Sequence, residues 1–349
     1  MSDRVVIALD AMGGDRAPEV VVAGAALARE RMPNTQFLMF GDEATIKPLL
    51  ENRAALAEVT TIRHTAEHIR SEDKPSTALK SGRGSSMRLA IDSVRDGEAH
   101  CVVSAGNTGA LMAIAKFVLK TLPGIDRPAI ATFFPTALGE SCMLDLGANV
   151  QCDANNLVQF AVMGEVFART VLGLEKPTIG LLNIGVEDLK GNEEVREAAA
   201  ILRDSDLPIA FKGFVEGDDI AAGTVDVIVT DGFTGNVALK TAEGTITFYT
   251  SLLKRAFNSS WIAQLGYLLA RRAISNLRST MDPRRYNGAM LLGLNGIVVK
   301  SHGGTDAVGF ANAIGVAADM VMHDFQSKIR DDFERLKSAE EPDRSAAAL

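Results

Sequence analysis

Short apolar runs rich in β-branched residues alternate with amphipathic segments along most of the 349-residue chain. Runs such as Val5–Leu9 and Val225–Thr230 are continuously hydrophobic, which is typical of strands covered by helices on both faces of a sheet. The predicted strands are Val5–Leu9, Phe37–Phe40, Thr60–His64, Cys101–Ser104, Ala129–Phe134, Cys142–Leu146, Thr178–Asn183, Ile209–Val215, Val225–Thr230 and Ile297–Lys300. The predicted helices include Pro18–Arg31, Ser85–Asp96, Thr108–Leu119, Asn155–Val171, Asn192–Arg203, Asn236–Phe257 and Asp306–Lys337. The alternation predicts βαβ units, and therefore an α/β fold with a mainly parallel sheet and helices on both faces.

Six of these strands run directly into turns made of glycine and small polar residues. The turns lie within Ala8–Asp15, Val102–Ala110, Leu144–Asn149, Leu181–Asn192, Ile228–Asn236 and Val299–Asp306. In an open parallel sheet such turns are expected to gather at the carboxyl edge, where ligands bind. Glycines let the backbone approach a ligand closely, and the helices that follow offer unpaired N–H groups. Any one of these segments can be a tight turn and nothing more, but six together predict an anion site, above all for phosphate.

The polar side chains in these turns are suited to binding oxyanions. They are Asn107, Asn149, Asn183, Asn236, Lys190, Lys240, His302, Asp10 and Asp15. Amide and ammonium groups donate hydrogen bonds to phosphate or carbonyl oxygens, and carboxylates orient such donors. His302 is either a donor or proton carrier, or a neutral histidine bonded to the turn backbone. Lys190 lies directly before Gly191 and is preferred over Lys240, which lies one turn into its helix.

Charge, cysteine content and missing motifs narrow the class of protein. The formal net charge of −8 argues against nucleic-acid binding, which requires a basic face. Three cysteines without a CxxC pair indicate a reducing compartment, and the sequence lacks a stretch long enough for a signal peptide or a membrane span. A cytoplasmic protein is therefore predicted. No GxGxxG follows a strand, and GxxxxGK[ST] and GxSxG do not occur, which argues against a dinucleotide site, a P-loop and a serine nucleophile.

Two short patterns suggest other chemistry. The segment from His64 to His68 has the HxxEH spacing of inverted zinc proteases. A strand-like run precedes it and a loop follows it, so the histidines do not share a helical face and no metal is predicted. Cys152 precedes a helix start, where a thiolate would be stabilised. It is either an acyl-accepting nucleophile or, as is commoner for a small cysteine, a buried residue.

The segment 245–280 differs from the rest of the chain in charge. It contains no Asp or Glu, whereas Lys254, Arg255, Arg271, Arg272 and Arg278 give it a charge of +5. Its run Trp261–Ala270 is apolar except for one glutamine and is too short to span a bilayer, which needs about 20 residues. Trp and Tyr favour membrane interfaces, and basic residues attract anionic lipid. We expect a helical hairpin that contacts the membrane through Trp261, Leu265 and Leu268, or packs against a second subunit, or does both.

Eight segments carry a resemblance to a known family. They are LDAMGGDRAPE, KPSTALKSGRGSSMRLAI, SAGNTGALM, LDLGANV, NLVQFAVMG, LLNIGVEDLKGNE, VTDGFTGNVALKTAEG and LLGLNGIVVKSHG. In this order they resemble the bacterial PlsX family, the acyl-carrier-protein:phosphate acyltransferases. The resemblance extends from Arg4 to Phe325 and implies a two-lobed fold similar to isocitrate dehydrogenase and phosphotransacetylase. We assign 1–336 to the acyltransferase unit, with the hairpin at 245–280, and 337–349 to a flexible tail.

The resemblance also implies an activity. A long-chain fatty acyl group would pass from the thioester of acyl carrier protein to inorganic phosphate, giving an acyl phosphate, and no cofactor is expected. The family resemblance further implies a homodimer that associates with the inner face of the cell membrane. There a membrane-bound glycerol-3-phosphate acyltransferase would use the product in phospholipid synthesis.

Such an enzyme needs mainly to hold phosphate and align its attack. Phosphate is largely dianionic near neutral pH, and a thiol is a good leaving group, so a strong base is not required. The residues expected to bind phosphate are Gly13, Gly14, Gly106, Asn107, Thr108 and Lys190. Asn236 or His302 would polarise the thioester carbonyl, and Asp10 would orient neighbouring donors.

Two other functions stay open. A short-chain phosphotransacetylase that uses acyl-coenzyme A shares the phosphate chemistry, but it would not need a surface that faces lipid. A non-catalytic scaffold at the membrane would leave the six turns without a purpose, and a fold by itself does not prove activity.

Overall fold

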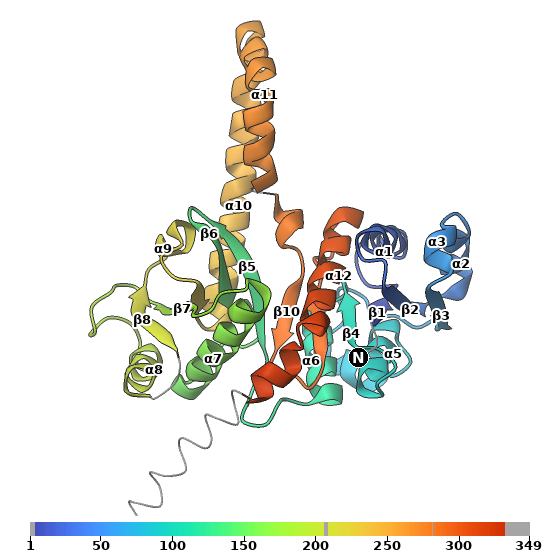
Figure 1. Cartoon of the computed structure of the whole chain (residues 1–349), viewed down its shortest axis with the longest axis horizontal. Helices are drawn as coiled ribbons and strands as arrows, with labels where there is room; N and C mark the ends of the chain where they lie inside the picture. The colour runs from blue at the N-terminus through green and yellow to red at the C-terminus, as the bar shows by residue number, and fades with distance from the viewer. Residues whose placement is uncertain (1–3, 206–208, 281, 332–349) are drawn as a thin grey trace, which may run out of the picture.

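The computed structural model describes residues 4–205, 209–280 and 282–331, and its strands form one sheet (Figure 1). The strands are β1 Val5–Asp10, β2 Thr35–Gly41, β3 Thr60–His64, β4 Cys101–Ser104, β5 Ala129–Thr136, β6 Gly139–Leu144, β7 Thr178–Leu182, β8 Ala210–Val215, β9 Val227–Val229, β10 Ala289–Leu292 and β11 Ile297–Lys300. Their order across the sheet is β3-β2-β1-β4-β11-β10-β5-β6-β9-β7-β8. Most neighbouring strands are parallel, which confirms the predicted mainly parallel α/β fold.

The sheet reverses direction near its centre. β10 is antiparallel to both of its neighbours, β11 and β5, and β5 is antiparallel to β6. The strands β6, β9, β7 and β8 therefore run opposite to β1, β2, β3, β4 and β11. The expectation that all six turns gather at one edge is wrong. The turns after β1, β4 and β11 lie at one edge of the sheet, which we call the first edge. The turns after β6, β7 and β9 lie at the opposite edge, which we call the second edge.

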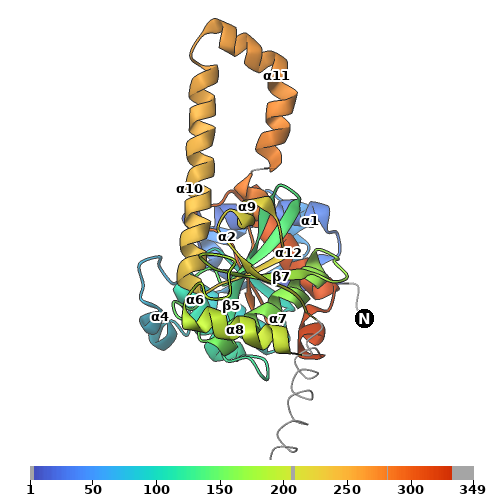
Figure 2. The same ribbon diagram turned by 90° about the vertical axis from the view of Figure 1, so that its left-hand side faces the viewer.

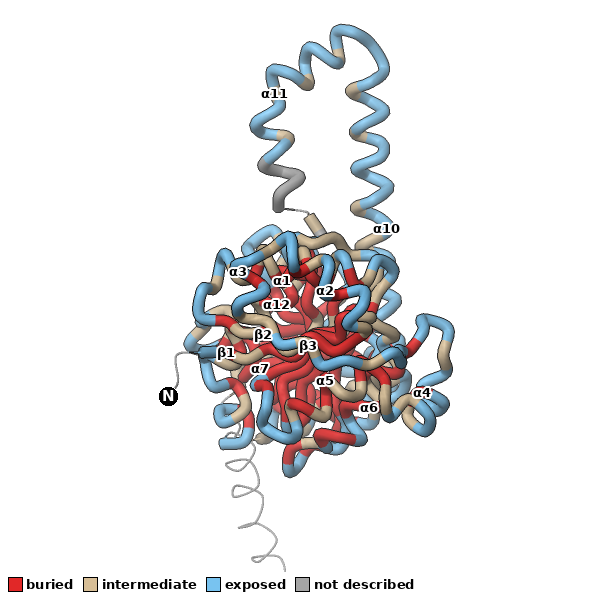
Figure 3. Tube along the Cα trace, turned by 90° about the vertical axis from the view of Figure 1, so that its right-hand side faces the viewer, coloured by how far each residue is buried: buried red, intermediate tan, exposed pale blue. Residues whose placement is uncertain are grey.

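Helices cover both faces of the sheet. They are α1 Glu19–Arg31, α2 Glu43–Glu51, α3 Ala54–Ala57, α4 Pro75–Ser81, α5 Ser86–Arg95, α6 Thr108–Leu119, α7 Ala154–Val171, α8 Glu193–Asp204, α9 Asp219–Ala222, α10 Gly232–Phe257, α11 Trp261–Thr280, the 3₁₀ helix η1 Pro283–Tyr286, and α12 Ala307–Met322. Alternate strand residues enter different cores, since side chains along a strand point to opposite faces. Ile7 and Leu9 belong to the core that also contains residues of α1, α7 and α12, whereas Ala8 belongs to the core with residues of α5 and α6. Figure 3 shows this buried centre beneath exposed helices and loops.

The structure differs from the predicted elements in a missed strand and an interrupted helix. β10 was not predicted, because its apolar run Ala289–Leu292 has no β-branched residue and is followed at once by Gly293. The predicted helix Asp306–Lys337 is not continuous: α12 ends at Met322, residues 325–331 are helical again, and 332–337 lie outside the described residues. A turn interrupts it at Asp324, whose φ of +50° does not fit a right-handed helix. The predicted tail, 337–349, lies outside the described residues.

The predicted hairpin is present and projects from the rest of the molecule (Figure 2). It consists of the second half of α10, a short turn and α11, with the Phe257 and Tyr267 rings 5.3 Å apart, edge to face. Trp261, Leu265 and Leu268 lie on one side of α11, and all three are exposed. Within the described residues, no helix is both long enough and apolar enough to cross a membrane. The Arg278 side chain lies outside the described side chains.

Candidate active site

Asp10, at the end of β1, forms the centre of the first edge. Its carboxylate accepts hydrogen bonds from the hydroxyls of Ser86, on α5, and Ser104, on β4, both at 2.6 Å. The Ser104 oxygen in turn accepts the backbone N–H of Gly106 at 3.0 Å. Burial raises the pKa of Asp10, while the two serine hydrogen bonds act in the opposite direction. Asp10 thus fixes α5 and the turn after β4 relative to β1.

The predicted glycines bring three turns together at this edge. A Cβ on Gly13 would lie 2.5 Å from the Asp10 carboxylate and 2.8 Å from the Gly106 nitrogen. Gly14 has a φ of +109°, and a Cβ there would lie 3.1 Å from the carbonyl oxygen of Gly303. The next residue, Asp15, donates its N–H to the same Gly303 carbonyl at 3.0 Å. The turns after β1, β4 and β11 therefore interlock through backbone contacts that only glycine permits.

Asn107 does not have the role predicted for it. Its amide nitrogen donates to the carbonyl oxygens of Ser71 at 2.8 Å and Asp73 at 3.0 Å, and its side-chain oxygen caps α6 by accepting the Ala110 N–H. Both amide protons are committed, so the side chain holds the 71–73 loop and is not available to phosphate. Thr108 begins α6 at the same edge, where the leading backbone N–H groups of the helix are found.

His302, in the turn after β11, is an exposed side chain with a structural contact. Its Nδ1 accepts the Gly304 N–H at 3.2 Å, and its own backbone N–H donates to the Asn287 side-chain oxygen at 2.8 Å. The ring is therefore bonded to the turn backbone, which is the second of the two roles that the sequence left open for His302. Its Nε2 has no hydrogen-bond partner among the described residues.

Lys300 is not among the residues predicted from the sequence, although it lies in the VVKSHG segment at the end of β11. Its ammonium donates to the carbonyl oxygens of Ala105, at 3.4 Å, and Ser301. Burial lowers its pKa to about 8, with Asp10 and Asp15 opposing that shift. A cation thus lies where the three turns of the first edge meet.

At the second edge, the buried carboxylate of Asp145 organises the turn after β6. It accepts the backbone N–H groups of Ile130, Ala148 and Asn149 at 2.7 to 3.0 Å. The Asn149 side-chain nitrogen donates to Asp145 and to the Pro128 carbonyl, so this asparagine is not free to bind a ligand. Burial raises the pKa of Asp145.

Lys190 and Asn236 also belong to the second edge. The Asn183 side chain holds the turn after β7 by donating to the Lys190 backbone carbonyl at 3.1 Å. The Lys190 side chain itself is exposed. Asn236 is exposed on the first turns of α10 beside Gly147, and its side chain has no hydrogen-bond partner among the described residues. The structure brings these two residues to one edge and places Asp10, Gly13, Gly14, Gly106 and His302 at the other.

Helix α10 connects the two edges. It begins at the end of β9, and Ala238, Leu239 and Ala242 pack along the same sheet face as α5 and α6. Lys240 lies one turn beyond Asn236 and is close enough to Lys300 for its charge to lower the pKa of Lys300. Lys240 also pairs with Glu243 at 2.7 Å. Groups from both edges are therefore linked along one helix.

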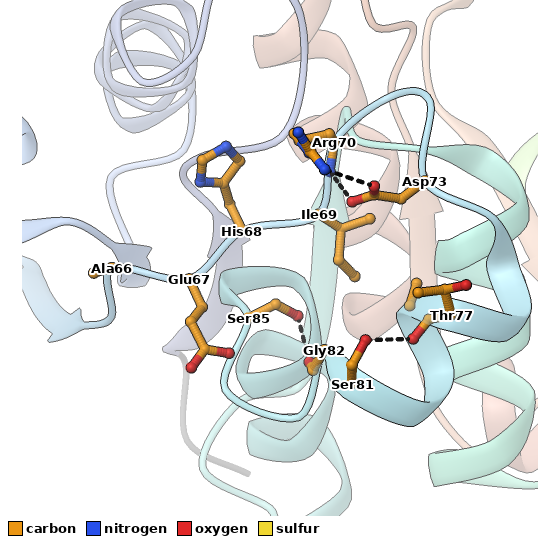
Figure 4. Close-up of a pocket in the computed structure, with 11 residues that line it drawn as sticks. Ala66, Glu67, His68, Ile69, Arg70, Asp73, Thr77, Ser81, Gly82 and Ser85 are labelled. Carbon is orange, nitrogen blue, oxygen red and sulfur yellow. Dashed lines mark hydrogen bonds and ion pairs between the residues drawn. The ribbon is translucent and has the colours of Figure 1, made fainter.

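A pocket of 410 Å³ lies beside this region, between the extended segment 66–70 and α4 (Figure 4). His68 lines it and is near enough to Asp10 to act on its pKa. His64, by contrast, lies at the end of β3, where its Nδ1 accepts the Glu43 N–H at 3.1 Å.

Cys152 is placed against the second edge. Its thiol donates to the Asn149 carbonyl at 3.7 Å, and burial together with the Asp145 charge raises its pKa to about 12. The thiol is therefore protonated near neutral pH, which disfavours it as a nucleophile.

Comparison with known proteins identifies the family. The family model described as "Fatty acid synthesis protein" matches residues 5–328. The chain is 68% identical to the phosphate acyltransferase of Rhodospirillum centenum, over 100% of this chain and 97% of that protein. It is 64% identical to that of Paramagnetospirillum magneticum, over 97% of each.

Solved structures share the fold at low identity. A phosphotransacetylase from Streptococcus pyogenes superposes with a TM-score of 0.62 at 18% identity, covering 92% of this chain and 95% of that one. The EutD phosphotransacetylase from Staphylococcus aureus gives 0.59 at 16% identity, with the same coverage. These similarities confirm the phosphotransacetylase-like fold implied by the family resemblance. The full-length identity to phosphate acyltransferases and the family match establish that the chain belongs to the fatty acid synthesis proteins of the PlsX family.

Proposed function

We propose that this protein transfers a long-chain fatty acyl group from the thioester of acyl carrier protein to inorganic phosphate. The observation that carries this proposal is the 68% identity, over the whole chain, to a protein named phosphate acyltransferase. The geometry agrees with it, because interlocked glycine turns and a buried lysine provide backbone donors and a positive charge at the first edge. The phosphotransacetylases share the fold, but their low identity does not carry their substrates to this chain.

The reaction requires no covalent enzyme intermediate. An oxygen of the phosphate dianion attacks the acyl carbon, and the carbon–sulfur bond breaks with its electron pair leaving on sulfur. The proton carried by the phosphate then passes to the thiolate, which gives the free thiol of the carrier and the acyl phosphate dianion. The enzyme's contribution is to hold the anions together and to stabilise the oxygen that becomes negative.

Residues from both edges take part in this proposal. The leading backbone N–H groups of α6, from Thr108 onward, bind phosphate beside the glycine turns, and Asp10 positions the Gly106 turn before them through Ser104. Lys190 and Asn236 are exposed and free of competing side-chain contacts among the described residues. Lys190 was predicted from the sequence to bind phosphate, but it lies at the second edge beside Asn236, and we assign both residues to the carbonyl of the acyl thioester. One such donor is typically worth about 3 kcal/mol in the transition state.

One assay decides between the enzymes. Purified protein is incubated with palmitoyl-acyl carrier protein and labelled phosphate, and labelled acyl phosphate is the expected product. Acetyl-coenzyme A in place of the carrier substrate should give little product. Preference for acetyl-coenzyme A would favour the phosphotransacetylase, and no phosphate-dependent loss of thioester from either donor would favour the scaffold.

We further propose that the hairpin binds the cell membrane reversibly from its inner face, in a homodimer. The exposed row of Trp261, Leu265 and Leu268 supports this, together with the basic residues that flank it. An acyl phosphate destined for a membrane-bound glycerol-3-phosphate acyltransferase gives such docking a purpose. The alternative role of the hairpin is packing against a second subunit. Replacing Leu265 and Leu268 by glutamate tests both roles.

A further inference from the structure

Lys300 is an unusual lysine for its position in the fold. It ends a central strand, its side chain is partly buried, and its hydrogen bonds go to two backbone carbonyls, those of Ala105 and Ser301. Within 4–205, 209–280 and 282–331, no carboxylate forms an ion pair with it. Burying a charge without a partner is costly, so a lysine in this setting needs a reason to be retained.

The surroundings of Lys300 suggest that reason. Ala105 belongs to the turn after β4 and Ser301 to the turn after β11, so the ammonium lies between two of the three interlocked turns. The Asp10 carboxylate already accepts two serine hydroxyls and is committed to fixing those turns. Asp15 is exposed, and Lys240 adds a second positive charge from the side of α10.

We propose that Lys300 is the cation that binds a phosphate oxyanion in the active site, and that this ligand is the inorganic phosphate acceptor. The inference rests on the proposed function and adds to it a binding residue that was not predicted from the sequence. The carrier's prosthetic group also contains a phosphate, as a diester, and kinetics separate the two sources.

The test compares Lys300→Met with Lys47→Met, which removes an exposed lysine from α2. We expect Lys300→Met to raise the KM for inorganic phosphate by about 10- to 100-fold, the usual worth of one charge-assisted hydrogen bond. The KM for palmitoyl-carrier protein should stay within about twofold, as one lost contact to the other substrate predicts no larger change. Lys47→Met should match wild type in both constants.

Stability gives a second measurement. Phosphate should raise the Tm of wild type and of Lys47→Met but not that of Lys300→Met. Without phosphate, Lys300→Met should be at least as stable as wild type, because an unpaired buried charge has been removed. A structural lysine would behave differently: its loss would lower the Tm and leave the KM for phosphate unchanged.

Wild-type enzyme provides a test that does not depend on how the variant folds. The charged groups that act on Lys300 are Asp10, Asp15 and Lys240, and its pKa is about 8. As pH rises from 7 to 9 the ammonium is lost, so the KM for phosphate, calculated for the concentration of the phosphate dianion at each pH, should rise.

Three results would overturn the inference in an enzyme that is active on phosphate. They are an unchanged KM for phosphate in folded Lys300→Met, an increase confined to the carrier substrate, and a flat pH profile. Inactive wild type would instead refute the proposed function.

Discussion

The membrane proposal predicts that replacing two leucines of the hairpin by glutamate abolishes lipid binding. Leu265 and Leu268 lie on one side of α11 and expose 51% and 62% of their surface. Complete burial of a leucine is worth about 1.5–3 kcal/mol, so moving these exposed fractions into lipid contributes about 1 kcal/mol each. Each glutamate adds about 1 kcal/mol of repulsion from anionic lipid. The double variant should therefore lose about 4 kcal/mol, or roughly three orders of magnitude in partitioning.

Liposome flotation measures this loss. Wild type should float with vesicles that contain phosphatidylglycerol and should float less with neutral vesicles or at high salt, because screening weakens attraction to the basic residues. Leu265→Glu/Leu268→Glu should remain in the soluble fraction while it keeps its turnover on soluble substrate. Leu138→Glu, which changes a still more exposed leucine in the β5–β6 turn, serves as the control and should float like wild type.

Unchanged flotation of a folded double variant would refute the membrane contact. A change of oligomeric mass in light scattering, with flotation retained, would assign the same row of side chains to a second subunit. The two measurements on one variant therefore separate both roles of the hairpin.

Three further predictions concern the active site. Lys190→Ala and Asn236→Ala should each lower turnover by about 100-fold, the usual cost of one transition-state donor, in a folded protein; near wild-type rates would remove that residue from the site. Incubation with acyl donor but without phosphate should leave the mass of the protein unchanged, because the Cys152 thiol is protonated; an adduct at Cys152 would contradict direct attack. Asp10→Ala should lower the free energy of unfolding by about 1–3 kcal/mol per buried serine hydroxyl left unpaired, whereas Asp10→Asn, which still accepts one of them, should lose less in chemical denaturation.

Most of the sheet could be predicted from the sequence, because its strands are continuous apolar runs. The bounds of Thr60–His64, Cys101–Ser104 and Ile297–Lys300 agree residue by residue with the structure. β10 could not be predicted in the same way, because its sequence AMLL contains no β-branched residue, whereas the equally short β4 and β11 are rich in valine and isoleucine. That omission had a large effect, because this strand and the β5–β6 hairpin reverse the sheet and separate the six turns into two groups.

The site could be predicted by residue type but not by hydrogen-bond partner. Asn107 and Asn236 both follow a strand and a glycine-containing turn, and nothing local distinguishes them. In the structure the Asn107 side chain holds the 71–73 loop, which is more than thirty residues away in sequence. The Asn236 side chain has no hydrogen-bond partner among the described residues. Lys300 could not be predicted as a site residue, because a lysine at the end of a strand is normally solvated. Only the packing of the surrounding turns withdraws this one from water.

If the hairpin binds lipid as proposed, the structure would place the enzyme's chemistry beside the membrane. Helix α10 carries Asn236 at the second edge, brings Lys240 close to Lys300 at the first edge, and then continues outward as one arm of the hairpin. The other arm returns through η1 to Asn287, whose side chain holds the backbone N–H of His302 and the hydroxyl of Ser301. Both ends of the hairpin thus continue into elements of the site, and its base lies at the first edge. Phosphate bound there by Lys300 would be acylated on the side of the molecule from which the apolar hairpin projects, so the product would be released toward the membrane surface and not across the sheet.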